Sequence, residues 1–334
     1  MGLIEDLVSD APNDEVIKKS IITTYQKMQE HEHILCSISG GSDSDIILDL
    51  CQRIPGAEKI QYAFFDTGLE FKATKEHLLY LEEKYGISID RVKAIKPIPV
   101  CCREFGQPFL SKQVSEWIGR LQSHGFAWED LPFDELYDKY PNCKAALRWW
   151  CNDFPNTSRG ISSYNIEYNA YLKEFLIDNP PNFLISNKCC HYAKKKVASD
   201  YKRKTCFDLN MYGVRKAEGG ARRGAYKNCF TPRKAGADEY RPIFWYKAEE
   251  KKEYEEYYGV EHSKCYSEYG LKRTGCAGCP YARNFEEELL AMQEFEPNLY
   301  KAVNNVFSDS YEYTRKYHKY VEQKKKEKKK QKEE

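Results

Sequence analysis

Apolar and polar positions in the first hundred residues follow two periods, one typical of buried strands and one of amphipathic helices. Short apolar runs at 33–39 and 60–65 predict strands, and a further strand is expected near 91–95. Between these runs, apolar positions recur every three or four residues over 45–53 and 72–85, which predicts helices. Strands that alternate with helices of this length predict the α/β class, with a doubly wound parallel sheet.

The pattern loosens between about 97 and 160, where we expect an elaboration inserted into the α/β domain. An amphipathic helix is predicted inside it, over 111–124. A helix over 164–176 and a strand over 183–186 are then expected to resume the sheet, with 211–214 as its last strand.

Composition is that of a folded protein. The chain has 334 residues, of which 41% are hydrophobic and 31% charged, enough for one large or two modest cores. Its formal net charge of +1 argues against a uniformly basic nucleic-acid binder and against an acidic solvating chain. Three segments are expected: an α/β domain over 1–218 that contains the insertion, a cysteine-containing appendage over 219–314, and a lysine-rich tail over 315–334.

Basic charge is nevertheless concentrated in two places. The tail, 315–334, holds ten Lys or Arg and four Asp or Glu, a net +6, which is typical of a solvated helix extension or a disordered tail. An arm that attracts polyanions is the alternative. The segment 188–234 holds 14 Lys or Arg and three Asp or Glu, a net +11. Any nucleic-acid partner would therefore be expected at these segments.

A turn with two glycines, Ser39-Gly40-Gly41-Ser42-Asp43-Ser44, follows the first predicted strand and precedes its helix. Glycines let a backbone approach an anion closely, serine hydroxyls donate to phosphate oxygens, and a helix N-terminus adds partial positive charge. The turn therefore suits pyrophosphate, although it matches neither GxxxxGK[ST] nor GxGxxG. Asp43 then needs a divalent cation, for which Mg²⁺ is the natural candidate, or a basic neighbour. The alternative is a serine-rich turn in which Asp43 caps the helix.

A second polar motif, Asp66-Thr67-Gly68-Leu69-Glu70, follows the second predicted strand, so its side chains should reach the same sheet edge. Together, SGGSDS and DTGLE resemble the PP-loop adenine nucleotide alpha-hydrolase-like superfamily, and within it the phosphoadenylyl-sulfate (PAPS) and adenylyl-sulfate (APS) reductases. The resemblance implies that the turn holds the phosphate or sulfate end of ATP, PAPS or APS. The implied contacts are Ser39, Gly40, Gly41, Ser42, Asp43, Ser44, Asp66, Thr67, Gly68 and Glu70. One departure is Ser42, where many relatives have lysine.

Thirteen cysteines require a chemical account, because disulfides are rare in the reducing compartment that we expect for this chain. The clearest groups are Cys189-Cys190 and Cys276-Ala277-Gly278-Cys279, since a CxxC turn presents two thiolates to one metal centre. Adjacent cysteines would strain a single tetrahedral zinc and suit a cubane cluster better; zinc and free thiols remain alternatives. The arrangement resembles the Cys-Cys…CxxC signature of APS reductases, which implies a [4Fe-4S] cluster beside the nucleotide. Three further cysteines are possible substitute ligands: Cys206, Cys229 and Cys265.

The basic segment also carries residues that the resemblance assigns to the nucleotide. It implies that Lys194, Arg215, Arg222 and Arg223 face the phosphates or sulfate, to which the planar donor fork of arginine is suited. Asp43, Arg215 and Arg222 are the candidate catalytic residues. Arg148, in the run LRWWC, is a weaker candidate.

Two reactions fit these motifs. The leading hypothesis is a PP-loop enzyme of the ATP-pyrophosphatase or sulfurtransferase type, with a sulfur donor protein and a nucleic-acid acceptor as partners. The alternative is a PAPS or APS reductase. Because no cysteine follows Cys279 in this sequence, a reductase would need a non-standard nucleophile such as Cys101 or Cys102. A nucleic-acid-associated accessory protein without turnover is a third reading, and a structural zinc protein a fourth.

The N-terminal segment carries acidic residues where a secretory signal would be basic and then apolar, and no stretch approaches the length of a membrane span. We therefore expect a cytoplasmic protein with no membrane partner.

Overall fold

The computed structural model describes residues 2–158, 160–218 and 225–333, which form two compact units. The first, called the sheet unit here, comprises 1–97, 192–277 and 287–299. The second, the helical unit, comprises 98–191, 278–286 and 300–334. The insertion expected at about 97–160 falls within the helical unit, which continues to His191.

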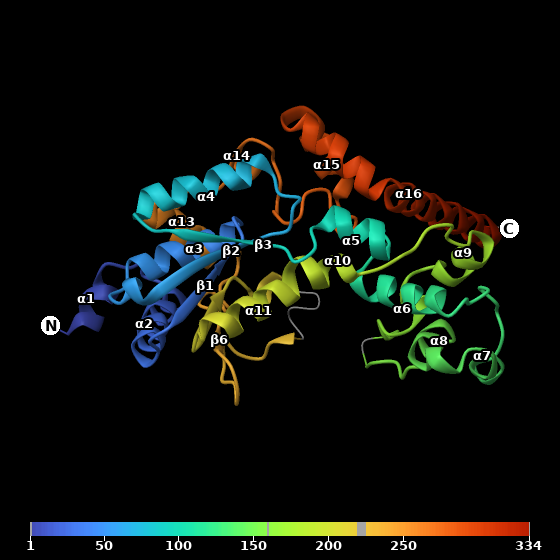
Figure 1. Ribbon diagram of the computed structural model, residues 1–334, viewed down its shortest axis with the longest axis horizontal. Helices are drawn as coiled ribbons and strands as arrows, with labels where there is room; N and C mark the ends of the chain where they lie inside the picture. The colour runs from blue at the N-terminus through green and yellow to red at the C-terminus, as the bar shows by residue number, and fades with distance from the viewer. Residues whose placement is uncertain (1, 159, 219–224, 334) are drawn as a thin grey trace. The chain divides into compact units, whose positions relative to one another are not determined.

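Six strands form the sheet, in the order β3-β2-β1-β4-β6-β5. Their bounds are β1 Ile34–Ile38, β2 Ile60–Asp66, β3 Ile89–Lys93, β4 Leu209–Tyr212, β5 Phe230–Thr231 and β6 Asp238–Tyr240. Neighbouring strands pair in parallel except for β5 with β6, which is antiparallel. The predicted α/β class with a doubly wound parallel sheet is confirmed (Figure 1).

Helices cover both faces of this sheet. Those of the sheet unit are α1 Leu3–Ser9, α2 Glu15–Glu30, α3 Ser42–Gln52, α4 Lys72–Tyr85, α11 Lys196–Thr205, α13 Ala248–Tyr258 and α14 Lys264–Ser267. Apolar residues of α2, α3, α4 and α13 share one core with β1 and β2. On the opposite face, Tyr201 of α11 packs with Leu35, Ala63 and Phe207. Alternate strand residues therefore serve two separate cores, as the unbroken apolar runs of β1 and β2 require.

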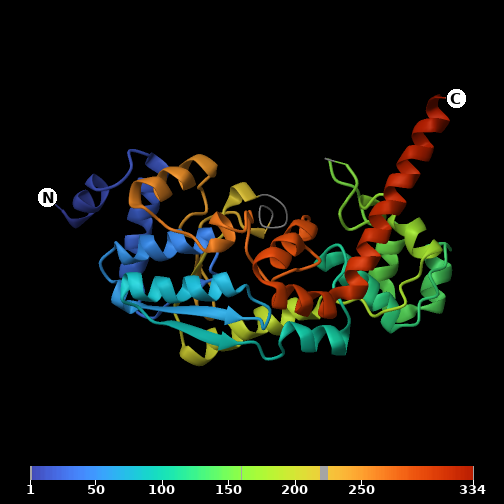
Figure 2. The ribbon, with the colours of Figure 1, turned by 90° about the horizontal axis from the view of Figure 1, so that it is seen from above.

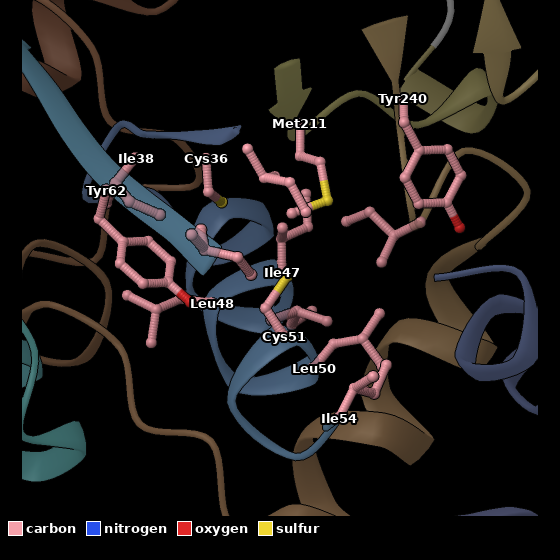
Figure 3. Packing of buried hydrophobic residues seen from close by; sticks show 14 of the residues in the cluster. Cys36, Ile38, Ile47, Leu48, Leu50, Cys51, Ile54, Tyr62, Met211 and Tyr240 are labelled. Atoms are coloured by element: carbon pink, nitrogen blue, oxygen red, sulfur yellow. The ribbon is translucent and has the colours of Figure 1, made fainter. Parts of the chain in front are cut away.

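The central helix is α3, which follows the glycine turn and is buried from Ser44 to Cys51. Its Ile47, Leu48 and Leu50 lie within the same core as Cys36 of β1 (Figure 3). Because apolar side chains surround this helix, its carboxylates Asp45 and Asp49 are also buried and must find partners inside the protein.

The helical unit is built from short helices packed on the C-terminal helix. Its helices are α5 Ile98–Phe105, α6 Lys112–Ser123, α7 Phe133–Lys139, α8 Lys144–Trp150, α9 Leu172–Asp178 and α10 Lys188–Cys190, with α15 Phe285–Phe295 and α16 Pro297–Glu333 beginning or ending in the sheet unit. Trp149 and Trp150 form its core with Phe175, Tyr313 and Tyr317. The lysine-rich tail continues α16 as helix to Glu333, which is one of the two forms expected for it (Figure 2).

Three expected elements are placed differently. The run 183–186 is not a sheet strand: Gln122 of α6 hydrogen-bonds the carbonyl of Phe183 at 2.7 Å and the N–H of Ile185 at 2.8 Å, and Ile185 forms one isolated bridge with Gln107. The helix expected from residue 164 begins at Leu172. The strand expected over 211–214 is β4, which pairs with β1 and is followed by β5 and β6.

Among the described residues, no helix has both the length and the apolar character that crossing a bilayer requires.

Candidate functional site

The glycine turn lies where the strand order reverses. β2 and β3 lie on one side of β1 and β4 lies on the other, so the carboxyl ends of β1 and β4 flank the crevice in which doubly wound sheets bind ligands. A pocket of about 110 Å³ is found there. It is lined by Ser39, Gly41, Ser42, Asp43, Gly213, Arg215, Glu218, Lys251, Tyr266, Lys272, Arg273 and Thr274. The predicted turn and Arg215 therefore meet at one site.

The backbone of the turn has little freedom. Gly40 has a φ of +67°, and a Cβ atom there would lie 2.6 Å from Cγ2 of Thr74. The hydroxyl of Ser44 donates to the carbonyl oxygen of Gly41 at 2.7 Å and accepts from the N–H of Ser39 at 3.2 Å. Ser44 is buried, so its role is to fix the turn. A side chain at Gly40 would be strained by φ and blocked by α4.

Asp43, in the first turn of α3, is paired with two cations. Nε of Arg215 donates to both carboxylate oxygens, at 2.9 and 3.0 Å. Nζ of Lys251, from α13, lies 3.1 Å from Oδ1 of Asp43 and 2.5 Å from Oγ of Ser42. The sequence called for a divalent cation or a basic neighbour at Asp43. The structure places two basic residues there: Arg215, which was a sequence candidate, and Lys251, which was not.

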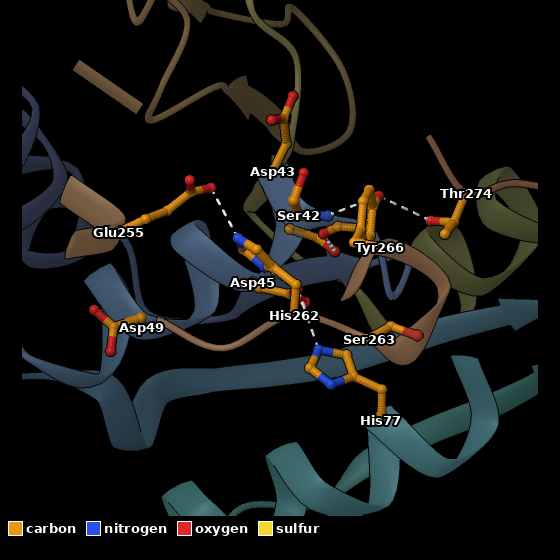
Figure 4. Close-up of polar contacts among 12 residues, drawn as sticks. Ser42, Asp43, Asp45, Asp49, His77, Glu255, His262, Ser263, Tyr266 and Thr274 are labelled. Atoms are coloured by element: carbon orange, nitrogen blue, oxygen red, sulfur yellow. Dashed lines mark hydrogen bonds and ion pairs between the residues drawn. The ribbon is translucent and has the colours of Figure 1, made fainter. Parts of the chain in front are cut away.

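The N-terminus of α3 lies at this pocket, which Ser42 and Asp43 line. The N–H of Ser42 donates to the hydroxyl of Tyr266 at 3.1 Å, and that hydroxyl lies 3.2 Å from Oγ1 of Thr274 (Figure 4). The Tyr266 hydroxyl thus occupies the acceptor position that an anion at the helix N-terminus would use. A phosphate oxygen bound there would replace it.

The pocket has excess positive charge. Four cationic side chains line it, Arg215, Lys251, Lys272 and Arg273, against the two carboxylates of Asp43 and Glu218. Arg273 and Glu218 lie 3.7 Å apart. A net positive, polar pocket at a helix N-terminus is suited to a multiply charged anion.

The DTGLE motif forms a tight loop after β2. The N–H and the hydroxyl of Thr67 both donate to Oε1 of Glu70, at 3.0 and 2.6 Å. The N–H of Gly68 donates to Oδ1 of Asp66 at 2.8 Å. Burial raises the pKa of Glu70, and the positive charge of Lys194 only partly opposes that shift. The buried Glu70 carboxyl therefore fixes the loop, and Lys194 lies at this loop.

One further segment touches both motifs. Thr274 lies against Gly41, where a Cβ would be 3.0 Å from its Oγ1, and the N–H of Ala277 donates to the carbonyl of Leu69 at 2.9 Å. Between them Cys276 interacts with Thr67 and Lys194, and burial raises the pKa of its thiol. The segment 274–277 therefore links the glycine turn with the DTGLE loop.

Beneath the pocket lies a buried charged network. The imidazole of His262 contacts Asp45 through Nδ1 and Glu255 through Nε2, each at 2.8 Å, and Asp45 also lies 3.1 Å from His77 (Figure 4). Glu255 in turn lies 3.5 Å from Lys251. Burial disfavours the imidazolium, but the hydrogen bonds with Asp45 and Glu255 outweigh it and raise the pKa of His262 to about 9. At neutral pH His262 is therefore charged.

The predicted metal ligands are divided between the units. Cys189, Cys190 and Cys279 belong to the helical unit and Cys276 to the sheet unit. Cys189 interacts with Cys102, Cys190 and Cys279, and its interaction with Cys102 raises the pKa of its thiol well above the ordinary value. The described residues contain no group of three or more His, Cys, Asp or Glu side chains arranged to hold a single metal ion.

The remaining sequence candidates lie elsewhere or are not described. Arg222 and Arg223 lie outside the described residues. Nε of Arg148, in the helical unit, lies 2.8 Å from Asp153. The three substitute cysteines all belong to the sheet unit: Cys206 is exposed, Cys229 borders the apolar core, and Cys265 is buried with its sulfur 3.7 Å from the hydroxyl of Thr74.

Seven pocket residues were missed from the sequence: Gly213, Glu218, Lys251, Tyr266, Lys272, Arg273 and Thr274. Lys272, Arg273 and Thr274 come shortly before the CxxC motif, and that proximity was a usable signal. Lys251 is one of several charged residues on α13, so only the fold distinguishes it.

Comparisons with known proteins find similarities to parts of this chain and to its fold. A curated relative, the GMP synthase [glutamine-hydrolyzing] of Bdellovibrio bacteriovorus, is 27% identical over 157 residues, which cover 46% of this chain and only 28% of that protein. A PAPS reductase from Candida auris, solved in a phosphate complex, has a TM-score of 0.42 and 12% identity, covering 83% of this chain and 96% of that one. A U34-tRNA thiolase from Methanococcus maripaludis, solved with its [4Fe-4S] cluster, has a TM-score of 0.36 and 13% identity, covering 91% and 80%.

The model of the phosphoadenosine phosphosulfate reductase domain matches residues 33–99. This segment runs from β1 through the glycine turn and the DTGLE loop to β3, and it therefore includes the two motifs that suggested the resemblance. Over this segment the chain is similar to the phosphoadenosine phosphosulfate reductase domain.

Proposed function

We propose that this protein is a PP-loop enzyme that binds the phosphates of an adenine nucleotide at the glycine turn and uses the nucleotide in sulfur chemistry. The observation that carries the proposal is the pocket at the N-terminus of α3, in which SGGSDS meets Arg215 and Lys251. The match to the reductase domain over 33–99 supports the nucleotide class.

The charge of the pocket favours ATP with pyrophosphate as the leaving group. An oxygen of the acceptor bonds to the α-phosphorus, and the bond from that phosphorus to the β-phosphate bridging oxygen breaks. Pyrophosphate then departs with the bonding electrons, and a sulfur nucleophile from a donor protein displaces AMP from the acceptor. Arg215, Lys251 and the α3 N-terminus stabilise the charge that develops on the leaving group.

Asp43 and Glu218 are the carboxylates that line the pocket, and they are the side chains that would hold a Mg²⁺ ion carried by the nucleotide. In the structure Asp43 is paired with Arg215 and Lys251. Binding of Mg·ATP would therefore exchange cation partners at this carboxylate, with Arg215 and Lys251 turning to phosphate oxygens.

We further propose that the thiols hold a [4Fe-4S] cluster. Cys190 and Cys279 both interact with Cys189 within one unit, and neighbouring thiols without a disulfide are the donor set that such clusters use. The fourth ligand stays a prediction, with Cys276 from the sequence pattern and Cys102 from its interaction with Cys189. When bound, the cluster supplies iron for holding and passing sulfur.

An acceptor that is a nucleic acid is proposed from the basic helix end at Lys202, Arg203 and Lys204 and from the lysines of α16. Binding through such residues should weaken steeply with added salt.

Product analysis tests the proposed function. The anaerobically purified full chain is incubated with a nucleic-acid acceptor, sulfide as the sulfur nucleophile, and Mg·ATP, PAPS or APS, and AMP, pyrophosphate and sulfite are measured. We expect AMP and pyrophosphate from ATP and no sulfite. Sulfite from PAPS or APS would assign a reductase instead, and salt-sensitive nucleic-acid binding with no turnover would assign an accessory protein.

A further inference from the structure

The glycine turn carries no cationic side chain of its own. Its polar groups are backbone N–H groups and the side chains of serines and one aspartate. A helix N-terminus contributes only about half an elementary charge. Binding a polyphosphate tightly at this turn therefore requires cationic side chains from elsewhere in the chain. The structure shows which of these side chains contact the turn.

Lys251 is the side chain that reaches the turn most directly. It comes from α13, more than 200 residues away in sequence, and its ammonium group lies 2.5 Å from Oγ of Ser42 and 3.1 Å from Oδ1 of Asp43. Its side chain is 17% exposed, whereas the side chain of Lys252, the next residue on the helix, is 74% exposed and pairs with Glu256, one turn on. Position on α13 thus separates a pocket lysine from a solvent lysine.

The ammonium group is held in place from below. Glu255, one turn further along α13, lies 3.5 Å from Nζ of Lys251 and is itself fixed at 2.8 Å by His262. His262 rests on Asp45, which is fully buried. These contacts hold the amine of Lys251 in position. Ser42 and Asp43, which it contacts, are the first two residues of α3.

Asp43 does not need Lys251 for its own neutralisation. Nε of Arg215 already donates to both carboxylate oxygens of Asp43, whereas Lys251 reaches only one of them and contacts the Ser42 hydroxyl more closely. Its amine therefore lies over position 42, at the first residue of α3. That is where an anion at the N-terminus of α3 would need a point charge.

We propose that Lys251 is a phosphate-binding residue of the nucleotide site and supplies the positive charge that the turn lacks at Ser42. This inference rests on the proposed function. The ligand class it implies is a polyphosphate, so that ATP and free pyrophosphate depend on Lys251 and adenosine does not.

The test is calorimetric binding of Mg·ATP, pyrophosphate and adenosine to the full chain and its variants. Lys251→Ala should weaken ATP and pyrophosphate at least tenfold and leave adenosine unchanged, whereas the control Lys252→Ala should bind like the wild type. Lys251→Arg should retain part of the affinity. Ser42→Lys in the Lys251→Ala background should restore the affinity for ATP and pyrophosphate. A lysine at position 42 would place an amine at the first residue of α3, where the amine of Lys251 lies in the wild type.

The outcomes separate the two claims. If the wild type binds ATP but Lys251→Ala binds it equally well, the inference is wrong and the proposed function stands. If the wild type binds neither ATP nor pyrophosphate, both are wrong. Circular dichroism and thermal unfolding of each variant identify a folding defect, and the Ser42→Lys rescue excludes such a defect as the cause of lost binding.

Discussion

Arg215 donates from a single nitrogen to both carboxylate oxygens of Asp43, and this contact joins the segment that follows β4 to the first turn of α3. It connects the two strand ends that flank the crevice. The pair therefore fixes the shape of the phosphate pocket and also keeps a cation within reach of it.

Replacement of Arg215 should disturb the shape of the pocket and also remove a cation that would contact the phosphates. We expect Arg215→Ala to lower kcat/KM for the nucleotide by roughly 10²- to 10³-fold, the range seen when one donor to a developing negative charge is removed. Steady-state kinetics on the substrate identified by product analysis measure this loss. Lys216→Ala is the matched control, since Nζ of Lys216 lies 4.7 Å from the ring of the half-exposed Trp245; an equal loss in both variants would count against the assigned role.

Gly40 should not tolerate a side chain. Gly40→Ala adds strain at a φ of +67° and a Cβ 2.6 Å from Thr74, whereas Gly86→Ala adds similar strain at a φ of +63° with no atom within 4 Å. A left-handed residue costs about 1–2 kcal/mol, so both variants should lose about that much stability in urea unfolding. Only Gly40→Ala should lose more and also lose nucleotide binding. Equal behaviour of the two variants would show that α4 does not constrain the turn.

His262 predicts a pH dependence of stability. Its folded pKa of about 9 exceeds the ordinary 6.5, so its contribution is complete below pH 6.5, declines between these values and is lost above pH 9. One pKa unit corresponds to 1.36 kcal/mol, so the contribution is up to about 3 kcal/mol. The difference in unfolding free energy between the wild type and His262→Gln should therefore shrink from pH 6 to pH 10. A difference that stays constant or grows would refute the charged network.

The thiol proposal predicts the iron content. Cys189→Ser and Cys279→Ser should lose most iron, acid-labile sulfide and visible absorption after anaerobic reconstitution, because each removes an interacting thiol. Cys206→Ser, at an exposed cysteine, is the control and should keep them. The same measurement on Cys102→Ser and Cys276→Ser assigns the fourth ligand. Full iron loading in Cys189→Ser would remove Cys189 from the ligand set.

The features best predicted from the sequence are those that depend on residues adjacent in the chain. The Ser39–Ser44 turn and the DTGLE loop each directly follow an apolar strand, so parallel pairing of β1 with β2 was enough to bring both to one edge. The run 183–186 has the same apolar character, yet Gln122 satisfies its backbone through a side chain that no local pattern reveals.

The rest of the pocket could not be predicted, because it depends on contacts across the chain. Tyr266 reaches Ser42 across 224 positions and Lys251 across 209. Aromatic and charged residues are abundant in the sequence around Tyr266 and Lys251, so the sequence alone does not distinguish these two from their neighbours. Only the packing of α13 and α14 selects these two side chains for the site.

The most direct test of the central claim is a crystal structure of the full chain with Mg²⁺ and a non-hydrolysable ATP analogue. The account predicts phosphate oxygens at the N-terminus of α3, within hydrogen-bond distance of the Ser42 N–H, with the Tyr266 hydroxyl displaced and Lys251 and Arg215 turned toward the phosphates. Phosphates bound away from the glycine turn, with Tyr266 still on Ser42, would contradict it.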